Sequence, residues 1–161
     1  MAKRRDVLGL RCEDPFGTVA AQVVSVRADE LLEHSEGVLD TSDIERLHDM
    51  RVASRRLRAA MEVFEPCFSR KRFRAALREV KAIADALGER RDRDVSIIAL
   101  ETFAAALAAP DRRGVAAMVD QLRKEQSLAN ERLVPFVDRR RLTDLRDGIE
   151  ELVAVADRRA A

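Results

Sequence analysis

The pattern of apolar and polar positions predicts helices along most of the chain. Between residues 42 and 64, apolar side chains recur at the three- and four-residue spacing of one helix face. This stripe consists of Leu47, Met50, Leu57, Met61 and Phe64. Ser42 and Glu45 have the spacing of a capping box, which predicts the N-terminus of this helix, and Pro66 predicts its end. No segment of useful length alternates with the period of two that a half-buried strand shows.

Similar stripes predict the remaining helices. The expected helices are, in approximate bounds, residues 18–34, 42–64, 69–88, 92–107, 111–136 and 142–157. Gly88 suits the left-handed position just past a helix end, and Asp92 or Asp94 can cap the helix that follows. Short connections between amphipathic helices favour an antiparallel bundle. We therefore expect an all-α fold of about six helices, with a flexible N-terminal arm at residues 1–15 and a single domain at residues 16–161.

Composition supports this fold class and restricts the location of the protein. The 161 residues are enough for one hydrophobic core, and the chain contains no Trp or Tyr and few Gly or Pro. Cys12 and Cys67 belong to no metal-binding or disulfide pattern. The longest apolar run, around residues 97–100, is too short to span a bilayer. These features predict a reduced, soluble, cytoplasmic protein that does not cross a membrane.

Charge is distributed unevenly along the chain. The formal net charge is only +1, which by itself argues against a protein that binds polyanions. Between Arg46 and Arg93, however, there are 14 Lys or Arg and 7 Asp or Glu, a local net charge of +7. The rest of the chain has a net charge of −6. A basic segment within an acidic chain indicates a localised surface that faces anions.

Within this segment the cations fall at helical spacing. The second helix carries the set His48, Arg51, Arg55 and Arg58, and the third helix carries Lys71, Arg74, Arg78 and Lys81. Both sets have the spacing i, i+3, i+7 and i+10, which covers an arc of about 80° and an axial length of about 15 Å. If both apolar stripes face one core, the two basic stripes flank a common groove. Alternatively they are solvated faces whose cations pair with Glu62, Glu79 and Asp85.

Other chemistry has little support in the sequence. No second His or Cys is placed to complete a metal site with His48. The carboxylates of Asp92 and Asp94 can in principle hold Mg²⁺, but a helix cap is the expected role of Asp92. No nucleophile–base pair and no glycine-rich phosphate loop is present. We expect no enzyme activity, no metal and no cofactor.

Two motifs resemble the CHAD family, the conserved histidine α-helical domain. The first is LHDMRVASRRLRAAMEVFEP at residues 47–66, which matches the family pattern His-x-x-Arg-Val-x-x-Arg-Arg-Leu-Arg. The second is REVKAIADALGERRDRDV at residues 78–95, which matches Leu-Gly-x-x-Arg-Asp-x-Asp-Val. Weaker resemblance extends from about Phe16 to Phe136. The chain departs from the family pattern at Arg93, where the family often has an apolar or small residue.

The resemblance implies a function and adds two residues to the candidate site. CHAD domains are helical and bind inorganic polyphosphate in a basic channel, and the matching motif positions add Arg56 and Arg91 to the seven cations and one histidine above. The family usually has a second helical half, so this chain is expected to supply one half and a homodimer the other. The apolar faces of the last two helices are either the candidate dimer contact or ordinary core: Val119, Leu133, Val137, Leu145, Ile149 and Leu152.

Three alternatives remain open from the sequence. The basic surface can bind the phosphate backbone of nucleic acids non-specifically, or the bundle can be a scaffold that docks a partner. The domain can also be an accessory to a separate phosphohydrolase. If polyphosphate is the ligand, association with polyphosphate granules in the cytoplasm is expected.

Overall fold

Residues 5–160 form five α-helices and two short 3₁₀ helices. The structure, a computed structural model, describes the backbone of residues 5–160 and the side chains of residues 5–156. The elements are α1 (Phe16–Glu33), α2 (Ile44–Val63), η1 (Glu65–Cys67), α3 (Arg70–Ala105), α4 (Ala109–Leu133), η2 (Val134–Phe136) and α5 (Arg139–Ala160). The described residues contain no strand, so the predicted all-α fold is confirmed. None of these helices combines the length and apolarity that a membrane span needs.

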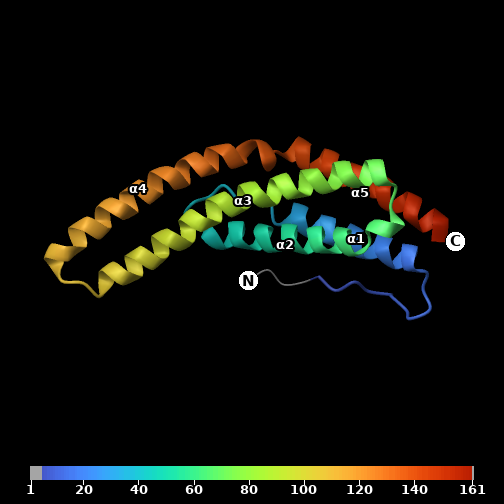
Figure 1. Cartoon of the computed structure of the whole chain (residues 1–161), viewed down its shortest axis with the longest axis horizontal. Coiled ribbons are helices and arrows are strands. Elements are labelled where there is room, and N and C mark those ends of the chain that lie inside the picture. The colour runs from blue at the N-terminus through green and yellow to red at the C-terminus, as the bar shows by residue number, and fades with distance from the viewer. Residues whose placement is uncertain (1–4, 161) are drawn as a thin grey trace.

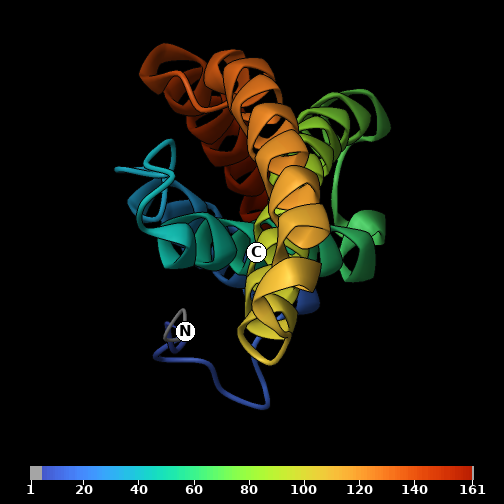
Figure 2. The ribbon, with the colours of Figure 1, turned by 90° about the vertical axis from the view of Figure 1, so that its left-hand side faces the viewer.

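The helices form a bundle with a projecting arm. Helices α1, α2, α5 and the first half of α3 pack together, with α1 in contact with both α2 and α5 and α3 in contact with α2 (Figure 1). The second half of α3 continues past this bundle and forms an antiparallel hairpin with α4, and Figure 2 looks along this hairpin toward the bundle. We call residues 95–125 of this hairpin the arm. The polypeptide of α4, η2 and α5 thus runs back along the whole length of α3.

The apolar stripe of α2 forms the centre of the bundle core. Leu47, Met50, Leu57 and Met61 are all 0% exposed, and Phe64 packs against the same core from a half-buried position. Fully burying a side chain of this size stabilises the fold by about 1.5–3 kcal/mol. The stripe predicted from the apolar spacing is therefore confirmed.

The apolar positions of α4 and α5 belong to the core of the single chain. Leu133, Leu145, Ile149 and Leu152 are buried in the same core as α1 and α2, and Val137 packs against it. Val119, the sixth residue of the expected dimer contact, is also buried, at 6% exposure. Because these side chains are covered within one chain, their assignment to a dimer contact is wrong.

The predicted break at Gly88 is also wrong, because α3 is one continuous helix of 36 residues. Gly88 does not have the positive φ of a helix-ending glycine. A Cβ atom at this position would lie 4.0 Å from Nε of Arg51, so α2 places an arginine side chain directly over the glycine. The two predicted helices at residues 69–88 and 92–107 are therefore both part of α3.

Replacing Gly88 by alanine is expected to stabilise the protein. The added methyl group meets Arg51 at ordinary van der Waals distance, and alanine in a helix interior is favoured over glycine by about 0.5–1 kcal/mol. In a protein of this size the melting temperature should rise by about 1–4 °C. Gly148→Ala in α5, where nothing lies within 4 Å of the new Cβ, is the matched control. If Gly148→Ala stabilises but Gly88→Ala destabilises, α3 is not a regular helix at residue 88.

Two further boundary predictions have different outcomes. The capping box at Ser42 and Glu45 does not form, because α2 begins at Ile44 after Asp43. Ser42 instead donates hydrogen bonds to the carboxylate of Asp40, from its hydroxyl at 2.7 Å and from its backbone N–H at 2.8 Å. Ser69 does precede α3, as predicted, although its side chain makes no capping hydrogen bond.

The segment before α1 carries no helix. Within it, Arg5 forms an ion pair with Glu33, and its carbonyl oxygen accepts a hydrogen bond from Arg27 at 2.9 Å. Residues 1–4 of the predicted flexible arm lie outside the described residues, as does residue 161 at the end of the predicted domain.

Candidate anion-binding surface

The basic stripes of α2 and α3 lie next to the contact between these two antiparallel helices. Two contacts define how the helices are aligned: Arg51 lies over Gly88, and the Lys81 ammonium is 3.4 Å from Oε1 of Glu62. The basic stripe of α2 therefore lies beside residues 81–91 of α3. The basic stripe of α3, at residues 71–81, lies beside the end of α2 and η1. The two stripes meet at Glu62 and are offset along the helix axes.

The offset produces one long basic surface. On α3, the positions from Lys71 to Lys81 share a face with Gly88 to within about 100°. Arg91, one turn beyond Gly88, is rotated by about 60° from it and by about 140° from Arg78. We call this surface the basic face; it consists of His48, Arg51, Arg55, Arg58, Lys71, Arg74, Arg78, Lys81 and Arg91. From Lys71 to Arg91 it extends about 30 Å along α3. Five hollows of the described surface are lined by residues outside the basic face. The two stripes are offset along the helices, and a groove between them stays a prediction.

Most cations of the basic face have no carboxylate partner among the described residues. No Asp or Glu oxygen in the described part of the chain lies within 4.0 Å of the guanidinium groups of Arg51, Arg55, Arg74 and Arg78. Glu79, a possible partner by sequence, instead forms an ion pair with Arg141 of α5, and this hydrogen bond raises the pKa of Arg141. Ion pairs within the described chain therefore neutralise only some of the cations of the basic face.

Glu62 is the carboxylate that does pair within the basic face. Its Oε1 atom accepts a hydrogen bond from Nε of Arg58 at 3.0 Å and lies 3.4 Å from Nζ of Lys81. The hydrogen bond from Arg58, helped by the one from Lys81, lowers the pKa of Glu62 below its usual value. Glu62 is therefore ionised at neutral pH and partly neutralises the point where the two stripes meet.

The two residues added by the family motifs differ in their position. Arg91 is half-buried beside the α2 stripe, and its Nη1 atom is buried without a hydrogen-bond partner in the described structure. Arg56 points elsewhere, because a helical rotation of about 100° separates it from Arg55 and about 140° from Arg51. Arg91 joins the basic face through its place one turn from Gly88, beside α2, and not through a shared face with Arg78. Nine of the ten predicted residues thus follow the contact between α2 and α3, and Arg56 points away from it.

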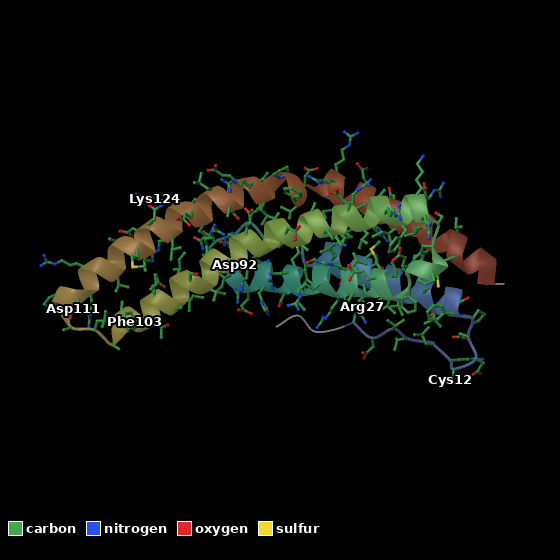
Figure 3. The ribbon with its side chains drawn as sticks, viewed as in Figure 1. Cys12, Arg27, Asp92, Phe103, Asp111 and Lys124 are labelled. Atoms are coloured by element: carbon green, nitrogen blue, oxygen red, sulfur yellow. The ribbon has the colours of Figure 1, made fainter. Side chains whose placement is uncertain are left out.

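Asp92 and Asp94 do not have the roles that the sequence predicted. Both lie inside α3, so neither caps a helix. Asp92 is exposed at the point where α3 passes the start of α2 (Figure 3), whereas Asp94 is 1% exposed on a different side of the helix. Among the described residues, no three His, Cys, Asp or Glu side chains are grouped to hold a metal ion.

A buried polar network at the base of the arm was not foreseen from the sequence. Arg90, which is fully buried, donates from Nε to Asp94 at 2.9 Å and from Nη1 to the amide oxygen of Asn130. Asp94 also accepts a hydrogen bond from Gln126 at 2.6 Å, and Asn130 donates to the carbonyl oxygen of Leu39 at 3.0 Å. The network joins α3, α4 and the loop before α2. Its sequence signal is an Arg and an Asp four residues apart at core-facing positions.

Fold and surface together define a class of protein: an all-α bundle in which two adjacent helices carry a line of cations, most of them without a carboxylate partner in the part of the chain that the structure describes. The family model described as CHAD domain matches residues 22–161, so the chain belongs to the CHAD domain family. This match covers all five helices at least in part and confirms the resemblance seen in the two motifs. No curated protein sequence matches the chain.

Proposed function

We propose that this protein binds inorganic polyphosphate on the basic face and does not catalyse a reaction. The observation that carries the proposal is the row of arginines, Arg51, Arg55, Arg74 and Arg78, that lack carboxylate partners in the described chain. Like charges one helical turn apart repel by a few tenths of a kcal/mol per pair, about 0.2–0.5 kcal/mol. A bound polyanion would remove this repulsion, and guanidinium groups suit the oxygens of phosphate.

The shape of the basic face supports a linear ligand. Its cations follow one line of about 30 Å along α2 and α3, which a flexible chain of phosphates can follow. Affinity would come mainly from release of the counterions that surround the polyanion, as it does for nucleic acids, and would fall steeply with added salt. Membership of the CHAD family adds support, because polyphosphate binding is what the resemblance implied.

Nucleic acid is the second candidate ligand. Proteins that bind single strands usually combine cations with aromatic side chains on which bases stack. The basic face includes no Phe, and Phe68 and Phe73 next to it are buried at 6% and 2% exposure. This absence of stacking partners favours a ligand without bases.

A competition experiment tests the proposed function. Binding of labelled long-chain polyphosphate would be competed with unlabelled long-chain polyphosphate, short polyphosphate, single-stranded DNA and RNA at equal phosphate concentration and moderate salt. We expect long-chain polyphosphate to compete best. Equal competition by all four ligands would indicate generic polyanion binding. Absence of any binding would contradict the proposal and favour the scaffold function.

Two other expectations remain predictions. A homodimer has no assigned contact surface now that the apolar side chains of α4 and α5 are placed in the core. Light scattering with and without polyphosphate would measure whether a dimer forms. We also propose a cytoplasmic location, with polyphosphate granules as the expected place of association.

A further inference from the structure

We infer that Glu62 is an internal counter-ion of the basic face, which a bound polyphosphate chain has to displace from Arg58 and Lys81. The inference rests on the proposed function and concerns how tightly the same surface binds. It follows from the position of Glu62, from its two contacts and from the poor fit of this residue to a purely structural role.

The position of Glu62 is the junction of the two basic stripes. One oxygen of its carboxylate contacts a cation from each stripe, Arg58 of α2 at 3.0 Å and Lys81 of α3 at 3.4 Å. A linear polyanion that follows both stripes has to pass this point. It therefore meets the negative charge of Glu62 in the middle of its path, and it can contact Arg58 and Lys81 only by replacing the carboxylate.

The ion pairs of Glu62 with Arg58 and Lys81 are exposed, so another anion can replace the carboxylate. The side chain of Glu62 is 43% exposed, Arg58 is 43% exposed and Lys81 is 39% exposed. Ion pairs at this exposure contribute little free energy, about 0–1 kcal/mol. An incoming phosphate oxygen can therefore take the place of the carboxylate oxygen at little cost to the fold.

Helix stability does not explain a glutamate at this position. Glu62 is the penultimate residue of α2, where a negative charge interacts unfavourably with the helix dipole. Its pair with Arg58 also has the less favourable order, with the acidic residue C-terminal to the basic one. The contacts of Glu62 with both stripes are its favourable interactions in the described structure.

The test compares two substitutions that change the net charge equally. Glu62→Gln removes the counter-ion, and Glu131→Gln removes a carboxylate that is exposed on α4 and forms no ion pair within the described chain. Affinity for long-chain polyphosphate would be measured for both variants and the wild type over a range of salt concentrations, together with the melting temperature.

We expect Glu62→Gln to bind polyphosphate about fivefold more tightly than the wild type, the factor that corresponds to one unit-charge contact in water. Its affinity should also depend more steeply on salt, because binding to the wild type frees the carboxylate of Glu62 to attract a counterion from solution, and Glu62→Gln has no such carboxylate. Glu131→Gln should bind like the wild type, and both variants should melt within a few degrees of it. Equal affinities of the two variants, with wild-type binding intact, would overturn the inference but not the proposed function. Failure of the wild type to bind polyphosphate would overturn both.

Discussion

Replacing Arg55 and Arg78 together by glutamate is expected to lower the affinity for long-chain polyphosphate about a hundredfold. Arg55 lies on the α2 part of the basic face and Arg78 on the α3 part, both are exposed, and neither pairs with a carboxylate of the described chain. A contact between unit charges is worth about 1 kcal/mol in water, and each substitution exchanges an attraction for a repulsion. Two such exchanges lower the binding free energy by more than a hundredfold loss of affinity requires. The flexible polyphosphate chain can rearrange and recover part of this loss, so the expected loss is about a hundredfold. Fluorescence anisotropy with labelled polyphosphate at fixed salt would measure it.

The control for this variant carries the same change in charge elsewhere. Arg113 and Lys124 are exposed on α4 and form no ion pair within the described chain, and Lys124 lies on the arm, away from α2 (Figure 3). The double variant Arg113→Glu with Lys124→Glu should lose at most a few-fold in affinity. If the two double variants lose affinity equally, polyphosphate responds to the net charge of the protein and the basic face is not its site.

Replacing Asp94 by alanine is expected to destabilise the protein by about 3–5 kcal/mol. Asp94 is the carboxylate partner of Arg90, and both side chains are 0% exposed. Without Asp94, the guanidinium group of Arg90 stays buried with Asn130 as its remaining partner among the described side chains. The melting temperature should fall by roughly 10 °C or more, because 1 kcal/mol corresponds to about 2–4 °C in a domain of this size. Calorimetry or thermal unfolding followed by circular dichroism would measure the shift.

Two comparison variants separate this effect from a general effect of losing an acidic residue. Asp92→Ala, only two residues away but exposed, should change the stability by no more than about 0.5 kcal/mol. Replacing both partners by apolar residues, Arg90→Met with Asp94→Leu, should recover part of the lost stability, because no charge is then left buried. A melting temperature of Asp94→Ala equal to that of Asp92→Ala would contradict the buried network.

The sequence was sufficient for the fold class and for the core of α2, but not for the extent of α3. Periodicity identifies helices wherever core-facing positions are apolar, as they are at Leu57 and Leu87. At Arg90 and Asp94 the core-facing positions are charged, so the apolar stripe of the sequence ends there although α3 continues, and Gly88 wrongly predicts a helix end. The two charges neutralise each other inside the protein, which is a tertiary contact that local patterns do not report.

The sequence predicted most of the residues of the candidate site, but it did not predict how the two stripes are arranged in space. Helical spacing identified the cations of both stripes because side chains three and four residues apart share a face. The offset between the stripes depends on how α2 and α3 are aligned, which Arg51 over Gly88 reveals in the structure. Arg56 shows the opposite case: the motif included it, but its direction on α2 places it off the basic face.

The arm gives the molecule an uneven distribution of local stability. Residues 95–125 project past the bundle (Figure 1), and only Ile97 and Val119 are buried among them. Segments with so few buried apolar contacts open at a lower free energy than the global unfolding of the protein. The hydrogen-bond network of Arg90 and Asn130 stands at the boundary between this segment and the bundle. Amide protons should therefore exchange with solvent fastest at the tip of the arm, and protection should rise along α3 and α4 until this network is reached.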